Sequence, residues 1–254
     1  MNTSKRRRIL IALALLLAVL ALLLLSLTLV VASASRDGLQ SLFGPGRTVE
    51  ETARILVHNW KFGGGAKKKA IEHGDEILPW LQKESKDFAL LNGHNSLWIA
   101  EVLGAIQTKR SRSILLDLYS RENTLARLTG AVGLARHGVL PDNLEEDSFL
   151  LAQVRNDPGR AEPRLAIIAL GWSKNERALP KLVEVLGEEN YGYWPRADAC
   201  DATARIGSPK AIPVLRNCLK SETFHPLPNA FRALVALGDR EAVPLAIARV
   251  GPEI

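Results

Sequence analysis

The chain contains little cysteine. Its 254 residues include two, Cys200 and Cys218, which excludes a disulfide-dense fold and allows at most one internal bridge. Aromatic residues account for only 6% of the chain, yet hydrophobic residues in total reach 47%. This balance is too apolar for a disordered chain. We therefore expect a folded core, in one large domain or in a solenoid.

Sequence patterns that mark common catalytic sites are missing. The five histidines are scattered, at His58, His73, His94, His137 and His225. No His-Glu-x-x-His motif and no Gly-x-Ser-x-Gly elbow is present. The run Gly63-Gly64-Gly65 precedes Lys67 but lacks the Gly-Lys-Ser/Thr ending of a phosphate loop. We expect a chain that is not an enzyme and that has no cofactor and no metal site.

Most of the basic surplus lies at the amino terminus. The formal net charge is +6, from 33 basic and 27 acidic residues, and residues 5–8 (Lys-Arg-Arg-Arg) supply four of the basic ones. The rest of the chain therefore carries a net charge of only +2. Proteins that bind a phosphate backbone usually show a concentrated basic face, so a nucleic-acid partner is not expected.

One long hydrophobic run follows this basic cluster. Residues 9–32 comprise 24 residues in which Ser26 and Thr28 are the only polar positions. At about 1.5 Å per helical residue, the run exceeds the roughly 30 Å hydrocarbon core of a bilayer. The sequence predicts a transmembrane signal-anchor helix. The alternative is a cleaved secretory signal, because cleavage of the Ala-Ser-Ala sequence after Ala34 would release a secreted protein.

The basic cluster also sets the expected orientation. By the positive-inside tendency, residues 1–8 stay in the cytoplasm and the bulk of the chain lies across the membrane, in the periplasm or outside the cell. Residues 33–47 mix Ser, Gly and Pro and are expected to form a flexible tether. Residues 48–254 are then the folded domain.

Local signals predict where the first helix of that domain begins and ends. Thr48, with Glu51 three residues later, forms a capping-box pattern ahead of an apolar stripe. We expect Gly63-Gly64-Gly65 to end this helix in a flexible loop, because glycine loses much conformational freedom in a helix.

Glycines recur at a nearly constant interval through the rest of the domain. Intervals of 34, 33, 36 and 31 residues separate Gly104, Gly138, Gly171, Gly207 and Gly238. Tiny residues stand five positions before the last four, at Gly133, Ala166, Ala202 and Ala233. A weaker copy begins at Gly74. Such a period predicts stacked helical hairpins that share one core, with the tiny residues where helices approach most closely.

The turn of each hairpin is best seen at residues 207–213. Gly207 is expected to end the first helix in the left-handed conformation, Ser208 to cap the next helix, and Pro209 to occupy its first turn. Pro213 is expected to bend the second helix slightly.

The unit "PRADACDATARIGSPKAIPVLRNCL", residues 195–219, shows the whole pattern: alanines line the first helix, an Ile-Gly turn follows, and the second helix carries proline. It resembles the HEAT repeat family, and specifically the short HEAT-like repeats also found in phycobilisome lyases. The resemblance covers roughly residues 66–250. It implies an all-α fold: an α/α superhelix, or solenoid, of about five to six hairpins. The transmembrane helix predicted from the apolar run at residues 9–32 precedes this solenoid.

This resemblance implies a binding protein. Solenoids present extended concave surfaces, so we expect a membrane-anchored protein-protein interaction scaffold or adaptor whose second helices contact unidentified protein partners. One alternative is a lyase-type enzyme, by analogy with phycobilisome lyases, which would need a bilin and a cytoplasmic-side domain. Another is a nucleic-acid-binding protein, by analogy with HEAT-like DNA glycosylases, which would need a basic concave face.

Two regions are candidate contact surfaces. The connection "NYGYWPR" offers Tyr191, Tyr193, Trp194 and Arg196, residue types that dominate binding hot spots. The alternative is that Trp194 folds back onto the neighbouring helix and the tyrosines cover it.

The second region is the carboxyl-terminal edge, where stacking stops. Its expected apolar residues are Phe231, Leu234, Leu245 and Ile247, with Leu245 the candidate partner contact. They predict a homodimer or a second protein at this edge. The alternative is that Arg232, Arg240 and Arg249 cover it with their aliphatic stems.

The two cysteines fall on the two helices of one hairpin. Antiparallel pairing places Cys200 opposite Leu215, about one turn from Cys218. Both a pair of small buried thiols and a bridge, which requires Cα atoms within about 7 Å, remain open.

Overall fold

The computed structural model describes residues 48–58, 63–142, 144–145, 148–157, 159–221 and 225–250. Residues 48–254 form one compact unit. The predicted anchor at residues 9–32, its basic flank and the tether lie outside the described residues. Among the helices that the structure does describe, none combines the length and the apolar character that a membrane span requires.

The described chain is built of helices and contains no strand. After α2 (Val49–His58), the helices follow one another in six pairs. The first members are α3 (Gly63–His73), α5 (Gly93–Ala105), α7 (Thr124–Arg136), α9 (Glu162–Ser173), α11 (Tyr193–Ile206) and α13 (Leu227–Ala236). The second members are α4 (Leu78–Glu84), α6 (Lys109–Ser120), α8 (Phe149–Gln153), α10 (Leu179–Gly187), α12 (Ile212–Lys220) and α14 (Ala242–Val250).

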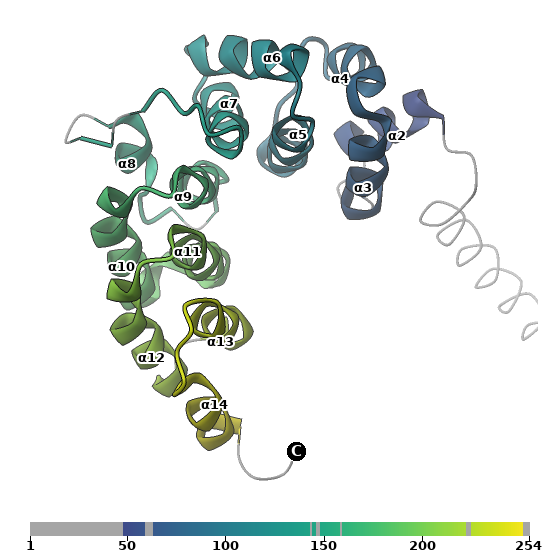
Figure 1. The fold of residues 1–254 in the computed structure, drawn as a ribbon. Coiled ribbons are helices and arrows are strands. Elements are labelled where there is room, and N and C mark those ends of the chain that lie inside the picture. The colour runs from purple at the N-terminus through teal and green to yellow at the C-terminus, as the bar shows by residue number, and fades with distance from the viewer. Residues whose placement is uncertain are drawn as a thin grey trace, which may run out of the picture. The chain divides into compact units, whose positions relative to one another are not determined.

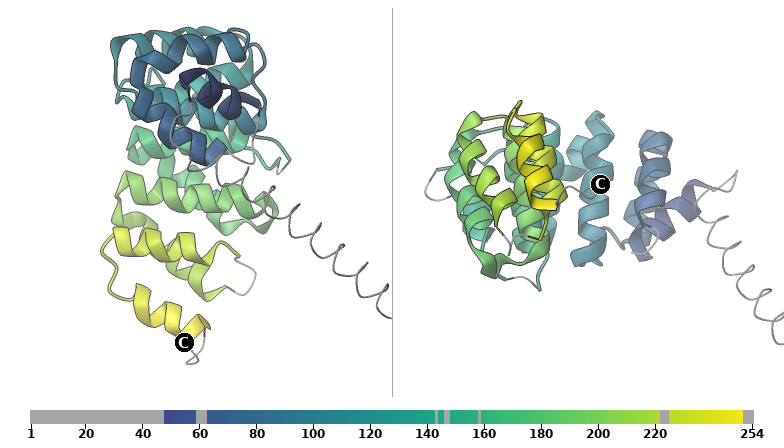
Figure 2. Two further views of the ribbon diagram at one scale, coloured as in Figure 1. Left: turned by 90° about the vertical axis from the view of Figure 1, so that its right-hand side faces the viewer. Right: turned by 90° about the horizontal axis from the view of Figure 1, so that it is seen from below.

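The first members pack successively against one another and form what we call the first-helix layer (Figure 1). The second members lie beside them as the second-helix layer, and Figure 2 shows α11 and α13 running side by side. This part of the chain is an all-α helical-repeat solenoid, as predicted. Its pairs are unequal, because the second helix after Gly138 is reduced to α8, Phe149–Gln153.

The core runs between the two layers. Buried aliphatic side chains form two neighbouring clusters, one around Leu56, Leu81 and Leu103 and the other around Leu170 and Leu215. The ring of Tyr119 packs against both clusters, so apolar packing continues from one half of the stack to the other. No pair buries its apolar face alone, and each depends on its neighbours.

The glycines that align the repeats turn out to have two different structural roles. Gly207 ends α11 at φ +77°, in the left-handed conformation expected of it. Gly171 instead lies inside α9, and the left-handed residue that ends that helix is Lys174, at φ +54°. The turn after α9 therefore falls three residues later than the glycine alignment predicts.

With Lys174 as the turn residue, the spacing to the next proline becomes regular. Pro180 follows Lys174 by six residues, just as Pro213 follows Gly207. In both cases a short 3-10 turn comes first, and the proline then occupies the first turn of α10 or α12. A proline at this position removes no internal hydrogen bond.

Thr48 caps α2 as predicted, because its Oγ1 accepts a hydrogen bond from the Glu51 amide at 3.1 Å. Two other local predictions are wrong. Ser208 occupies the cap position before the 3-10 turn Pro209–Ala211, but its side chain makes no capping hydrogen bond. The glycine run does not form a loop, because α3 begins at Gly63. Ala66 and Ala70 are buried on one face of α3.

Candidate functional site

The segment "NYGYWPR" contributes two buried and two exposed candidate residues. Tyr191 is buried, and its hydroxyl donates a hydrogen bond to Glu184 Oε1 at 2.9 Å. Arg196 is also buried, and its Nη2 donates to the Leu186 carbonyl at 3.2 Å. The packing interpretation describes these two residues. As candidate partner contacts they are corrected, because their polar ends are used inside the fold.

The other two candidates lie on the surface. Gly192, at φ +74°, directs the chain into α11, which starts at Tyr193. Tyr193 is exposed, and Trp194 is 61% exposed. Their rings meet edge to face, with centroids 5.0 Å apart. The indole of Trp194 therefore stays exposed and is not covered by the tyrosines, as the packing alternative expected, although its ring contacts Arg164 of the neighbouring helix α9.

The exposed indole contacts a cation on the neighbouring helix. The guanidinium of Arg164, on α9, lies 5.2 Å from the centre of the Trp194 ring. Arg164 is fixed by two hydrogen bonds to Asp198, Nε to Oδ2 at 2.6 Å and Nη2 to Oδ1 at 3.3 Å. Asp198 follows Trp194 by four residues, so both project from one face of α11. Burial raises the pKa of Asp198, although the bonds from Arg164 oppose the increase.

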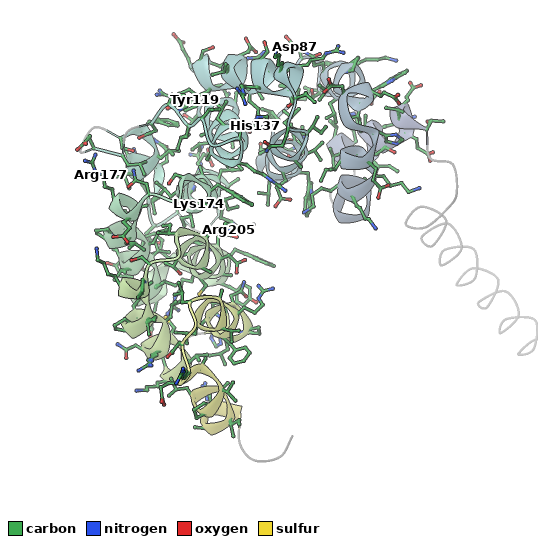
Figure 3. All side chains as sticks on the ribbon, viewed as in Figure 1. Asp87, Tyr119, His137, Lys174, Arg177 and Arg205 are labelled. Atoms are coloured by element: carbon green, nitrogen blue, oxygen red, sulfur yellow. The ribbon has the colours of Figure 1, made fainter. Side chains whose placement is uncertain are left out.

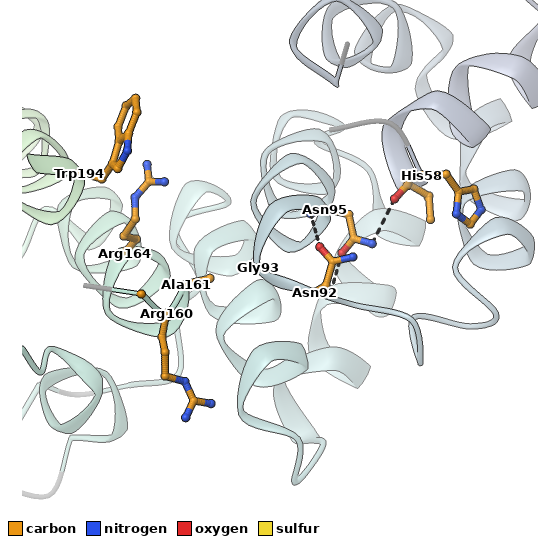
Figure 4. A pocket seen from close by; sticks show the side chains of 10 residues that line it. His58, Asn92, Gly93, Asn95, Arg160, Ala161, Arg164 and Trp194 are labelled. Atoms are coloured by element: carbon orange, nitrogen blue, oxygen red, sulfur yellow. Dashed lines mark hydrogen bonds between the residues drawn. The ribbon is translucent and has the colours of Figure 1, made fainter. Parts of the chain in front are cut away.

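Trp194 and Arg164 border an open cavity of about 440 Å³ (Figure 4). The end of α2 contributes His58, and the start of α5 contributes Asn92, Gly93 and Asn95. The segment that leads into α9 contributes Arg160. The cavity thus draws its lining from helices far apart in the sequence, which explains why no contiguous motif predicts it.

Local hydrogen bonds shape the α2 and α5 side of this cavity. Asn92 and Asn95 bond reciprocally: the Asn92 amide donates to Asn95 Oδ1 at 2.7 Å, and the Asn95 amide donates to Asn92 Oδ1 at 3.1 Å. Asn95 Nδ2 also donates to the Val57 carbonyl at 3.2 Å, which ties α5 to α2. A Cβ at Gly93 would lie only 2.9 Å from Ala161 Cβ, so the starts of α5 and α9 touch.

In the ion pairs near the cavity, the basic side chain is more exposed than its acidic partner. Arg160 Nη2 contacts Glu162 Oε1 at 2.6 Å, and their side chains are 64% and 12% exposed. In the Arg164–Asp198 pair these values are 28% and 15%. His58 is likewise more exposed than Glu84, 3.2 Å away. Burial raises the pKa of Glu162, but the bond from Arg160 and backbone bonds outweigh it and keep that pKa low.

A second cation and aromatic group lies at the other end of the first helices. The ring of Trp172 lies between the guanidiniums of Arg136, at 4.9 Å, and Arg205, at 4.8 Å. Arg205 can be found on α11 in Figure 3. Each of the three residues stands two positions before a left-handed turn residue: Arg136 before Gly138, Trp172 before Lys174 and Arg205 before Gly207. The glycine alignment did not bring Arg136, Trp172 and Arg205 into register, because it placed the turn after α9 at Gly171, whereas the structure places it at Lys174.

At the carboxyl-terminal edge, the exposed apolar residues differ from those that the sequence predicted. Leu234 is fully buried and is therefore not an open contact, whereas Leu245 is half-buried and packs partly against the core. Val235, Val243 and Ile247 are the large apolar side chains exposed there. Arg232 Nη2 reaches back to Asp201 Oδ1, 3.4 Å away, in the preceding pair. It therefore does not cover the edge as the alternative required.

The cysteines and possible metal ligands complete the survey of reactive groups. Cys200 and Cys218 are both buried free thiols. Within the ranges that the structure describes, no three His, Cys, Asp or Glu residues gather in a group that could hold a metal ion.

Comparison with known proteins supports the repeat assignment. Residues 147–227 match the model of HEAT repeats. The matched range extends from just before α8 through α12 to the first residue of α13. No curated protein and no solved structure matches the chain significantly. The match supports the HEAT repeat family, whose members commonly act as protein-interaction scaffolds.

Proposed function

We propose that this protein is a non-enzymatic, membrane-anchored scaffold that binds a protein partner at the cavity beside Trp194. The single observation that carries the proposal is the exposed indole of Trp194, held in place by Arg164 and Asp198. Tryptophan and arginine are enriched in binding hot spots, where a rigid aromatic group loses little entropy on association.

The placement of the cavity supports binding on the first helices. Trp194 and Arg164 belong to α11 and α9, two adjacent members of the first-helix layer. The expectation that second helices provide the contacts is therefore replaced by a proposal for the first-helix layer. The apolar run of residues 9–32 and its basic flank support the membrane anchor, with residues 48–254 on the extracytoplasmic side.

Site-specific photo-crosslinking in native membranes tests this function. A photoreactive amino acid replaces Trp194 in the full-length protein, and a matched variant carries it at Leu116, an exposed residue of α6 in the second-helix layer. We expect a discrete protein adduct from position 194 and none of the same mass from position 116. Equal adducts from both positions, or no adduct from position 194, would contradict the proposed binding face.

A further inference from the structure

The group of Arg136, Trp172 and Arg205 carries positive charge that no acidic side chain of the described fold pairs with. We infer that this group binds an acidic segment of a protein, with two carboxylates held by the two guanidiniums. Its surface differs from the cavity beside Trp194, because Arg205 lies about 16 Å further along α11. The inference therefore does not depend on what that cavity binds.

The first step is that Arg136 has no acidic partner. Its Nη1 donates a hydrogen bond to the backbone carbonyl of Glu101 at 3.2 Å, which is an uncharged acceptor. The carboxylate of Glu101 instead contacts Lys67 Nζ at 2.6 Å. Within the described ranges, Arg136 forms no ion pair. The carboxyl end of α7 offsets only about half an elementary charge, so Arg136 keeps an excess of positive charge.

The second step is that Arg205 lacks an acidic partner as well. Two carboxylates precede it on α11, but both are engaged by other cations. Asp198 accepts two hydrogen bonds from Arg164, and Asp201 Oδ1 lies 3.4 Å from Arg232 Nη2. Arg205 is the weakest of the influences that act on the pKa of Asp198. Among the residues that the structure describes, none forms an ion pair or a hydrogen bond with the Arg205 side chain.

The third step is that one indole holds the two cations near each other. The guanidiniums of Arg136 and Arg205 lie 4.9 and 4.8 Å from the centre of the Trp172 ring. Their separation therefore does not exceed roughly one Debye length at 0.1 M salt, about 10 Å, and their fields add. A guanidinium stacks through its flat face, so the donors around its edge stay available. All three side chains are half-buried, and a ligand can reach them.

The fourth step selects an extended acidic peptide as the ligand. Acidic residues at alternate positions of an extended strand project to one side about 7 Å apart, a spacing that suits two neighbouring guanidiniums. Each carboxylate can accept two parallel hydrogen bonds from one guanidinium.

A single-stranded nucleic acid fits this group poorly. Its bases bind by stacking on aromatic rings. Arg136 and Arg205 come from α7 and α11, which pack on either side of α9, and their guanidiniums already cover the Trp172 ring. The chain after residue 8 also has a net charge of only +2, far below the concentrated basic charge that phosphate binding uses.

Fluorescence anisotropy with a labelled peptide tests the inference. The probe is a fluorescein-labelled dodecapeptide in which Glu alternates with Ser, and the control peptide carries Gln in place of Glu. The receptor is the full-length protein in micelles of a non-ionic detergent. The site variant combines Arg136→Gln and Arg205→Gln. The control variant combines Lys210→Gln and Arg232→Gln, which removes the same charge from two cations that have acidic partners.

We expect the wild type to bind the Glu peptide and not the Gln peptide. Affinity for the Glu peptide should fall by about tenfold or more in the site variant, because hydrogen bonds between charged groups are lost at both arginines, and by less than about twofold in the control variant. Each single substitution, Arg136→Gln or Arg205→Gln, should weaken binding by about threefold, which keeps the test valid if the double variant does not fold. Circular dichroism verifies the fold of every variant.

Two results would overturn the inference: equal losses in the site and control variants, or equal binding of the two peptides. Tighter binding of oligo-dT than of the Glu peptide, lost in the site variant, would overturn it in favour of nucleic acid.

This titration and the crosslinking at position 194 report on different surfaces. Peptide binding that requires Arg136 and Arg205, without an adduct from position 194, would support the acidic-segment site and reject the cavity as the partner site. An adduct from position 194 without peptide binding would support the cavity and reject the acidic-segment site.

Discussion

Gly171 of α9 packs directly against Ala202 of α11. A Cβ built on Gly171 would lie 2.6 Å from Ala202 Cα and 2.7 Å from its Cβ, so the two helices meet through the backbone of one and the smallest side chain of the other. The same contact recurs earlier in the stack, where a Cβ on Gly104 would lie 3.0 Å from Gly133 Cα. Neighbouring first helices are therefore held at a separation that admits no larger residue.

This contact makes Ala202 a sensitive position. Ala202→Leu should destabilise the fold by about 1–3 kcal/mol, because the added atoms enter space that Gly171 already fills. Lys210→Ala, at an exposed position, should change stability by no more than about 0.5 kcal/mol. Denaturant melts of residues 48–254 measure both effects. Equal midpoints for the two variants would show that this helix contact does not limit the packing.

Sequence reasoning predicted the repeat and its small-residue column but misplaced one turn. Gly133, Ala166, Ala202 and Ala233 are all buried, as their position five residues before each glycine predicted. Gly171 misled the alignment because glycine serves two purposes, a left-handed turn and a close helix contact, that leave the same letter in the sequence. Lysine rarely adopts positive φ, so Lys174 gave no signal of a turn.

The candidate site was predictable only in part, for a physical reason. Trp194 attracted notice because Tyr and Trp cluster in one connection, but the sequence could not decide which of these rings points outward. The turn at Gly192 decides it, since Tyr191 lies before that turn and Trp194 after it. The contribution of His58 and Arg160 depends on which helices lie side by side, and no local pattern encodes that.

The two thiols should be unreactive in the folded protein. Burial raises the pKa of Cys218 to about 11, and burial together with nearby Cys218 raises the pKa of Cys200 well above its usual range. At pH 8 a thiol of pKa 11 is thiolate in roughly one molecule per thousand. We expect slow reaction with a disulfide reagent in buffer and rapid reaction of two thiols in denaturant. Rapid labelling of the folded chain would contradict the burial, and no thiol in denaturant would indicate the bridge.

Acid should weaken the last two pairs through Asp239. A hydrogen bond from Arg216, Nε to Oδ2 at 2.9 Å, lowers the pKa of Asp239 in the folded chain. The unfolded chain therefore takes up this proton first as pH falls below about 4, and the stabilisation is lost as pH falls through the lower folded pKa.

Asp239→Asn should therefore be less stable than the wild type at pH 7 and should lose less stability between pH 4 and pH 2. Arg216→Gln should show the same shallower dependence, because it removes the cation that lowers the pKa. Urea melts at several pH values measure both slopes. A slope equal to that of the wild type in both variants would exclude this pair as an acid-sensitive contact.

The membrane proposal predicts a defined topology. Protease added to cells with a permeabilised outer barrier should digest residues 48–254 while a cytoplasmic marker protein stays intact, because the cluster at residues 5–8 should remain inside. Complete protection of residues 48–254, together with an accessible amino terminus, would reverse the orientation. Recovery of the protein in the soluble fraction with a new terminus at Ser35 would support the cleaved signal instead.

The carboxyl-terminal edge predicts self-association. Val243 and Ile247 stand four residues apart on α14, so they share one face of the last helix, and Ile247 is 56% exposed. Two copies related by a two-fold axis would cover these faces with each other and extend the stacking that the solenoid uses internally. The half-buried position of Leu245 makes Ile247 the better residue to change.

Sedimentation of residues 48–254 over a range of concentrations tests this contact. The wild-type fragment should approach the mass of a dimer as concentration rises, and Ile247→Glu should remain a monomer, because a dimer would bury two uncompensated carboxylates. Leu116→Glu, which places the same charge on exposed α6, should still dimerise. A wild-type fragment that stays monomeric throughout would exclude a homodimer at this edge, whereas loss of association in both variants would indicate a charge effect unrelated to α14.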